Sequence, residues 1–152
     1  MDYVNAVIAY AQGHPMLVLA LIFFVYKQWQ ARQPFPTVAG SRVQSLVAEE
    51  QLEAARARPG VIVIDAFALW CPPCRSAAVP YGEMSKLPEF AQVSFFKVNV
   101  DEAPDVAASL GVSALPTFVI YNGQDEVKRI TGADMAAVKE TVLALVQQGA
   151  SE

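Results

Sequence analysis

A run of apolar residues at 61–67 (VIVIDAF) constrains the fold of this chain more than any other feature. Pro59 and Gly60 stand before it, and apolar residues occupy both its odd and its even positions. Because successive side chains of a strand point to opposite faces, such a strand needs a cover on each side, which helices usually supply. The run therefore predicts a central strand of an α/β domain. Asp65 is its single charged residue, and a buried carboxylate is costly unless it is paired or protonated.

The neighbouring segments alternate between helical and strand patterns. Between the last two predicted strands, Asn122 and Gly123 form a dipeptide that favours a tight hairpin turn. This order predicts an α/β sandwich with a central mixed sheet, in which parallel strands come first, an antiparallel hairpin comes last and helices cover both faces. The expected helices cover 48–57, 75–87, 105–110 and 133–148, and the expected strands cover 61–67, 93–100, 117–121 and 127–131.

The N-terminal part of the chain has the composition of a membrane anchor. Residues 4–26 contain no Lys, Arg, Asp or Glu, and 16–26 are uninterrupted apolar sequence. A helix over 4–26 would be roughly 34 Å long, which is enough to cross a hydrocarbon core of roughly 30 Å. Polar residues and Pro15 interrupt the run, so an interfacial helix and a soluble packing helix are the alternatives. We expect a spanning anchor that is retained rather than cleaved.

The residues after the apolar run indicate the topology and the domain boundaries. Lys27 and Arg32 are the first basic residues, and positive charge beside a membrane helix favours the cytosolic side. We therefore expect a hydrophobic membrane-anchor helix over 1–32, a Pro- and Gly-containing linker over 33–41 and a domain over 42–152 that faces the cytosol. The net charge of −4 comes from that domain, which argues against nucleic-acid binding.

Both cysteines of the chain, Cys71 and Cys74, lie where the central strand gives way to the next helix. Two cysteines and one histidine, His14, are too few for a zinc or iron–sulfur site within one chain, so we expect no metal. A disulfide that closes so short a loop stabilises the fold only slightly. A metal site shared between two chains and a purely structural disulfide are the alternatives to redox chemistry.

The position of the pair favours the redox interpretation. A thiolate at a helix N-terminus is stabilised by the helix dipole and by unpaired N–H groups, which lowers its pKa. Cys71 occupies that place, and we expect it to be the nucleophile. Cys74 follows one turn later and would resolve a mixed disulfide formed on Cys71. Pro72 and Pro73, which separate the cysteines, fit a first helical turn because the missing N–H groups cost little there.

These motifs together resemble the thioredoxin family over about residues 41–148. The Trp-Cys-Pro-Pro-Cys block begins at Trp70, and the buried Asp65 precedes it as in the family. The sequence KVNVD at 97–101 resembles the end of a family strand, Leu115-Pro116-Thr117 resembles the cis-proline turn, and Gly132 stands before the last helix. The resemblance implies a thioredoxin-like sandwich and a protein-disulfide reductase that needs no cofactor.

The resemblance also implies roles for the matched residues. Asp65, with Lys97 as its partner, would relay a proton to or from Cys74. The structural alternatives are an Asp65 at a strand end that faces water, a Trp70 that covers the core and a trans Pro116. The expected partners are protein disulfide substrates, an electron-donating reductase and a membrane contacted through residues 4–26. The residues expected to bind substrate are Trp70, Pro72, Pro73, Leu115, Pro116 and Gly132.

The cysteine pair departs from the family pattern because Pro72 stands where the family norm is glycine. The resulting Cys-Pro-Pro-Cys sequence resembles that of tryparedoxins and of some membrane-tethered thioredoxin-like reductases. We expect a tethered reductase of protein disulfides in the cytosol. One alternative is a tethered reductase outside the cytosol, acting on exported proteins or in cytochrome maturation. The other is a non-catalytic membrane adaptor built on the same fold.

Overall fold

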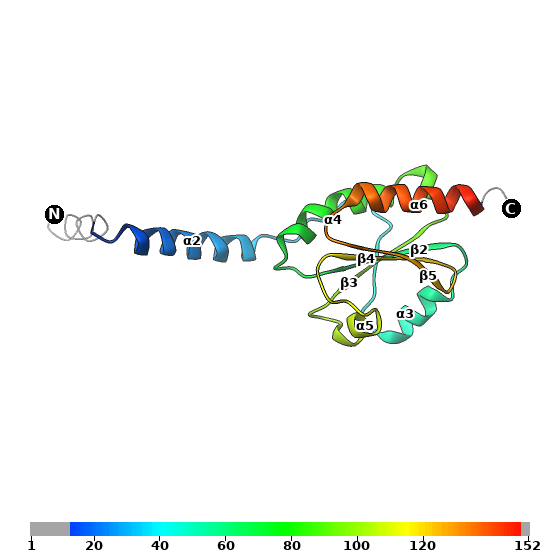
Figure 1. Ribbon diagram of the computed structural model, residues 1–152, viewed down its shortest axis with the longest axis horizontal. Coiled ribbons are helices and arrows are strands. Elements are labelled where there is room, and N and C mark those ends of the chain that lie inside the picture. The colour runs from blue at the N-terminus through cyan, green and yellow to red at the C-terminus, as the bar shows by residue number, and fades with distance from the viewer. Residues whose placement is uncertain (1–12, 150–152) are drawn as a thin grey trace. The chain divides into compact units, whose positions relative to one another are not determined.

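The computed structural model describes residues 13–149. The chain divides into two compact units, Met1–Pro34 and Phe35–Glu152. In the first unit, α2 covers Pro15–Arg32 (Figure 1). Its apolar side chains are largely exposed to solvent, namely those of Met16, Leu17, Leu19, Leu21, Ile22, Phe23, Phe24 and Val25.

The expected membrane span is not found among the described residues. None of the helices within 13–149 combines the length and the apolar character that a span needs. The apolar part of α2, residues 16–26, would reach only about 16 Å, which is about half of a hydrocarbon core. The rest of the run that we expected to span, residues 4–12, lies outside the described residues.

The second unit confirms the predicted α/β sandwich with a central mixed sheet. The sheet has the strand order β1-β3-β2-β4-β5. The first three strands in this order pair in parallel, while β4 pairs antiparallel with both β2 and β5. Helices α4 and α6 cover one face, and α3 and α5 cover the other (Figure 1). The elements are β1 (Gln44–Ser45), α3 (Glu49–Arg56), β2 (Val61–Phe67), α4 (Pro72–Met84), the 3-10 helix η1 (Pro88–Phe90), β3 (Ser94–Asn99), α5 (Pro104–Ser109), β4 (Thr117–Asn122), β5 (Asp125–Thr131) and α6 (Met135–Gly149).

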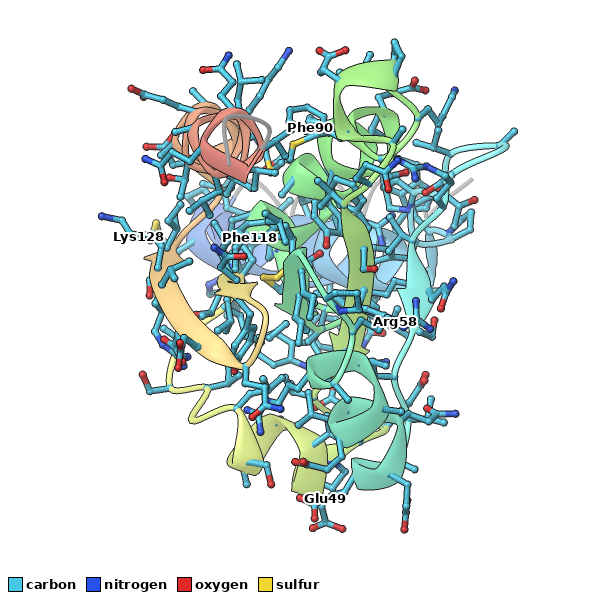
Figure 2. The ribbon with its side chains drawn as sticks, turned by 90° about the vertical axis from the view of Figure 1, so that its right-hand side faces the viewer. Glu49, Arg58, Phe90, Phe118 and Lys128 are labelled. Carbon is cyan, nitrogen blue, oxygen red and sulfur yellow. A yellow bond between two sulfur atoms is a disulfide. The ribbon has the colours of Figure 1, made fainter. Side chains whose placement is uncertain are left out.

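The two faces of β2 explain why its sequence is apolar throughout. Val61 and Val63 pack into the core layer under α4 and α6, whereas Ile62 and Ile64 pack into the layer under α3 and α5. Figure 2 shows Phe90 and Phe118 on the α4 and α6 side of the sheet, with Glu49 of α3 on the opposite side. Since side chains alternate along a strand, Asp65 shares the α4 face with Val61 and Val63.

The domain also contains elements that the sequence patterns did not predict. Strand β1 has only two residues, which pair with Phe96 and Lys97 of β3, and a strand so short shows no periodicity. The 3-10 helix η1, which follows α4, has only 3 residues and is likewise too short to show a periodic pattern. The hairpin of β4 and β5 is present as predicted, and Gly123 takes the positive φ of 61° in its turn.

The compact domain begins at Phe35, within the segment that we expected to be a linker over 33–41. The Phe35 ring packs on Phe67, with 4.7 Å between the ring centroids. The Ser41 hydroxyl lies 3.1 Å from the hydroxyl of Ser85 at the end of α4. The chain from Phe35 to Ser41 is therefore part of the packed domain, which we had placed at 42–152.

Candidate active site

The cysteine pair lies at the N-terminus of α4, immediately after the central strand. Cys71 is the N-cap of the helix and Cys74 lies in its first turn. The two form a disulfide with 5.3 Å between their Cα atoms, so the structure represents the oxidised form. Cys71 is 3% exposed and Cys74 is fully buried. Only the edge of the disulfide at Cys71 is therefore open to a reacting sulfur.

The first turn of α4 directs a hydrogen-bond donor at Cys71. Pro72 and Pro73 fill its first two positions and have no N–H groups. The first available donor is the N–H of Cys74, which points to the Cys71 Sγ with an N-to-S distance of 3.2 Å. Together with the positive end of the helix dipole, this donor stabilises negative charge on that sulfur. The geometry thus favours Cys71 as the thiolate once the pair is reduced.

The side chain before the pair, Trp70, lies on the surface and is held there by a hydrogen bond. It is 64% exposed, and its Nε1–H donates to the Oδ2 of Asp101 over 2.8 Å. This excludes the alternative in which Trp70 covers the core. Asp101 was not among the expected site residues, although it is the last residue of the KVNVD motif that the sequence analysis singled out.

A groove of about 440 Å³ opens beside the disulfide. It brings Trp70, Pro72 and Pro73 together with Leu115, although these residues come from two distant parts of the chain. The sequence analysis did not predict the other wall of the groove, which includes Val100, Ala107 and Val112. In the sequence, such apolar residues look the same as residues of the hydrophobic core. The full lining is Trp70, Cys71, Pro72, Pro73, Val100, Ala107, Val112, Ser113, Ala114 and Leu115.

The other two residues expected to bind substrate, Pro116 and Gly132, are linked by a backbone hydrogen bond. The Leu115–Pro116 peptide bond is cis, which excludes the trans alternative. The N–H of Gly132 donates to the Pro116 carbonyl oxygen over 2.8 Å, and Gly132 has a φ of 98°, which favours glycine. Pro116 itself is buried, whereas Leu115 packs against the cysteine pair.

Asp65 is buried on the α4 side of the sheet rather than facing water. It is 3% exposed, and its Oδ1 has no hydrogen-bond partner among the described residues. Burial raises the pKa of Asp65 to about 7, against the opposing effect of the Lys97 charge. Lys97 is the neighbour of Asp65 in the register of β2 and β3. A carboxyl group that titrates near neutral pH is suited to taking up and releasing a proton.

Tyr81 forms the floor next to Asp65 and was not predicted as a site residue. Its hydroxyl lies 2.8 Å from the Phe96 carbonyl oxygen and 3.0 Å from that of Val63. Burial, reinforced by the nearby Asp65 charge, raises the pKa of Tyr81 well above its usual value. Tyr81 therefore stays protonated and ties α4 to the sheet beside the carboxyl group.

A second cavity, of about 200 Å³, lies against Asp65 and Lys97. On the α4 side it is lined by Ala78, Tyr81 and Gly82. Ala78 comes four residues after Cys74, so both lie on the same face of the helix. The remaining wall is formed by Phe35, Pro36, Thr37, Val38, Ser41 and Val43. Within residues 13–149, no three His, Cys, Asp or Glu side chains gather closely enough to hold a metal ion.

The thioredoxin family model matches residues 43–144, which is most of the α/β domain. The chain belongs to the thioredoxin family. As a thioredoxin-like α/β domain with a closely spaced cysteine pair, it is a thiol–disulfide oxidoreductase. The matched region starts at Val43, so the segment from Phe35 to Ser41 lies before it.

Individual thioredoxins support the assignment in sequence and in structure. Thioredoxin-2 of Saccharomyces cerevisiae is 38% identical over 82 residues, which are 54% of this chain and 77% of that protein. An H-type thioredoxin of Brassica campestris is 40% identical over 93 residues, or 61% of this chain and 74% of that protein. The crystal structure of Fasciola hepatica thioredoxin has a TM-score of 0.62 and 36% identity, covering 67% of this chain and 98% of its own.

Proposed function

We propose that this thioredoxin-family protein reduces disulfides in protein substrates, with Cys71 as the attacking thiolate and Cys74 as the resolving thiol. The observation that carries the proposal is the Cys74 N–H aimed at the Cys71 Sγ beside an apolar groove. The groove offers an extended polypeptide a surface next to the more accessible sulfur. Trp70, Pro72, Pro73, Leu115, Pro116 and Gly132 are the residues proposed to bind that substrate.

The reaction conserves atoms and electrons as follows. The Cys71 thiolate attacks one substrate sulfur, so a mixed disulfide forms and the first substrate thiolate leaves and takes a proton. The Cys74 thiol then gives its proton to the Asp65 carboxylate and attacks the Cys71 Sγ. The Cys71–Cys74 disulfide forms and the second substrate thiolate leaves. Two electrons have passed to the substrate, and a separate reductase restores the pair. Lys97 counters the negative charge of Asp65 before the proton arrives.

A trapping experiment tests the roles of the two cysteines. Cys74→Ser leaves Cys71 able to attack but removes the thiol that resolves the product. We expect this variant to accumulate a mixed disulfide with a protein substrate, visible on a non-reducing gel and released by dithiothreitol. Cys71→Ser is the matched control and should trap little. A folded Cys74→Ser variant that traps no more than Cys71→Ser would support the adaptor alternative instead.

The direction of the reaction has its own measurement. A Cys71–Cys74 reduction potential near the roughly −270 mV of thioredoxin indicates a reductant, whereas a potential near roughly −120 mV indicates an oxidant. We expect the former. Equilibration of the purified protein with glutathione or dithiothreitol redox buffers gives the value.

Membrane attachment through the N-terminal segment, residues 4–26, is part of the same proposal. Its support is the row of exposed apolar side chains on α2. In the full-length protein, Leu21→Asp with Ile22→Asp should abolish co-flotation with phospholipid vesicles. Val127→Asp, at an exposed position of β5, is the control and should float like the wild type. Equal recovery of all three proteins with the vesicles would contradict attachment through this segment.

We further propose that the domain faces the cytosol, on the strength of Lys27 and Arg32 after the apolar run. Protease treatment of intact and permeabilised cells distinguishes the two sides. If the outer layers of the cell are permeabilised and the plasma membrane stays intact, a domain in the cytosol should be protected from the protease. Digestion from outside favours the alternative of a tethered reductase for exported proteins or cytochrome maturation.

A further inference from the structure

The segment from Phe35 to Ser41, here called the strap, packs directly against the redox centre. Phe35 joins the apolar cluster that contains Phe67, Cys71 and Cys74. The guanidinium of Arg75, the residue after Cys74, lies 5.7 Å from the centre of the Phe35 ring.

The far end of the strap packs on α4, where Val38 lies directly against Gly82. A Cβ added to Gly82 would come within 2.7 Å of the Val38 Cγ2 and 2.9 Å of its Cβ. Val38 can therefore lie here only because residue 82 has no side chain. Ser41 completes the attachment, since its hydroxyl lies 3.1 Å from that of Ser85.

Between these two attachments the strap covers the cavity that reaches Asp65. The cavity has a volume of about 200 Å³, which is room for several water molecules. The Oδ1 of Asp65 is buried and has no hydrogen-bond partner in the described part of the chain. A buried carboxyl oxygen without a described protein partner, beside a cavity of this size, is a place where water binds. Pro36 and Thr37 form part of the wall on the strap side.

We propose that the strap closes this cavity and thereby sets how readily Asp65 exchanges its proton with solvent. Phe35 and Val38 are positioning residues in this role, because they act through Asp65 and not on the sulfur atoms. The inference rests on the proposed function of Asp65 as acceptor of the Cys74 proton. After each resolving step Asp65 must return that proton to water, and water reaches it past the strap.

The groups that face Asp65 come from each neighbouring element. Lys97 lies beside it on β3, Tyr81 on α4 and the uncharged Phe118 on β4. The Cys71 and Cys74 thiols also titrate once the pair is reduced. In the oxidised protein the sulfur atoms carry no proton, so a carboxyl titration near neutral pH reports Asp65 without them.

The test follows the Asp65 carboxyl carbon by ¹³C NMR as a function of pH in the oxidised full-length protein. Asp65→Asn identifies the signal. Gly82→Ala should push Val38 away and admit water, which favours the ionised carboxyl and raises its acid dissociation constant by about threefold or more. Gly149→Ala in α6 is the matched control, because nothing lies within 4 Å of the added Cβ.

A second pair of variants tests the other end of the strap. Phe35→Ala should raise the acid dissociation constant as Gly82→Ala does, and Phe35→Leu should largely restore it. Leu143→Ala removes a half-buried side chain of α6 and serves as the control for lost packing. Folded Gly82→Ala and Phe35→Ala proteins whose Asp65 titrates like the two controls would overturn the proposal.

The titration needs no substrate, so its outcome is separate from that of the trapping experiment. A shifted Asp65 titration in a protein that traps no substrate would refute the proposed reduction and leave the strap's action on the carboxyl intact. Normal trapping with an unshifted titration would refute the strap alone. In an active protein, Gly82→Ala should also move the acidic limb of the pH–rate profile to lower pH, which a purely structural role would not do.

Discussion

The chemistry of this protein depends on a few side chains whose surroundings differ sharply. Cys71 receives a backbone N–H at the start of α4, whereas Asp65 has an oxygen without any partner among the described residues. The first environment favours a negative charge and the second opposes one. The start of α4 therefore favours a thiolate at Cys71 once the pair is reduced, whereas burial keeps the pKa of Asp65 near neutral pH.

Asp65 should make the stability of the oxidised protein depend on pH. Its pKa is about 7 in the folded state and near 3.8 when unfolded, so the folded state binds one more proton between these values. The stabilising effect of that proton is fully present below the unfolded pKa and is lost as pH rises through the folded pKa. The free energy of unfolding should fall by up to about 4 kcal/mol over this interval.

Asp65→Asn should remove that fall and make the protein more stable than the wild type at pH 8. Urea unfolding of both proteins at pH 4.5 and pH 8 measures it, since the difference between the two proteins isolates this residue from other titrating groups. Parallel losses of stability in the two proteins would show that burial does not raise the pKa of Asp65.

Trp70 should affect substrate reactions more than stability. Trp70→Phe keeps a ring beside Cys71 but loses the hydrogen bond to Asp101, which leaves the ring free to turn. We expect kcat/KM for a protein disulfide to fall by about threefold to tenfold, mainly through KM, and unfolding free energy to change by less than about 1 kcal/mol. Trp29→Phe in α2 is the matched control, and an equal effect of the two would remove Trp70 from the binding surface.

Helix α4 carries the cysteine pair at its start and contacts both the sheet and the strap further along. Its first turn carries the redox pair, and Tyr81 and Gly82 later in the helix meet the sheet and the strap. Pro80 lies between them in the helix interior. The helix is thus a rigid part that fixes the sulfur atoms relative to Asp65.

Tyr81→Phe should loosen the attachment of α4 to the sheet. The buried hydroxyl lies within hydrogen-bond distance of the Val63 and Phe96 carbonyl oxygens, and its removal deletes this link between α4 and the sheet. We expect a loss of about 1–3 kcal/mol in unfolding free energy, measured by urea denaturation. The exposed Tyr26→Phe is the control and should change nothing. A Tyr81→Phe protein as stable as that control would show that the hydroxyl does not anchor the helix.

For the molecule as a whole, the sequence predicted the layers, the strand types and the redox pair. The pattern of 61–67 required helices on both faces, and the position of Cys71 at a helix start was readable from its neighbours. The strap was not predicted, because Pro34, Pro36 and Gly40 give it the composition of a linker. Its packing depends on Gly82, far away in sequence, and no local pattern records such a contact.

Two truncated proteins test where the domain begins. A chain that starts at Phe35 should keep the stability of the domain, because the compact unit begins there. A chain that starts at Arg42 lacks Phe35 and Val38 and should lose about 2 kcal/mol, from the apolar area that these side chains bury. Urea unfolding of both compares them directly. Equal stabilities would mean that the strap contributes no packing energy.

The two prolines between the cysteines determine which backbone amide can support the Cys71 sulfur. Since neither Pro72 nor Pro73 can donate, the amide that supports the Cys71 sulfur belongs to Cys74 itself. That amide survives any replacement of the Cys74 side chain other than by proline. In the proposed reaction, replacing the Cys74 side chain would therefore remove the thiol that releases the substrate, while the main-chain support of the Cys71 sulfur that captures it would remain.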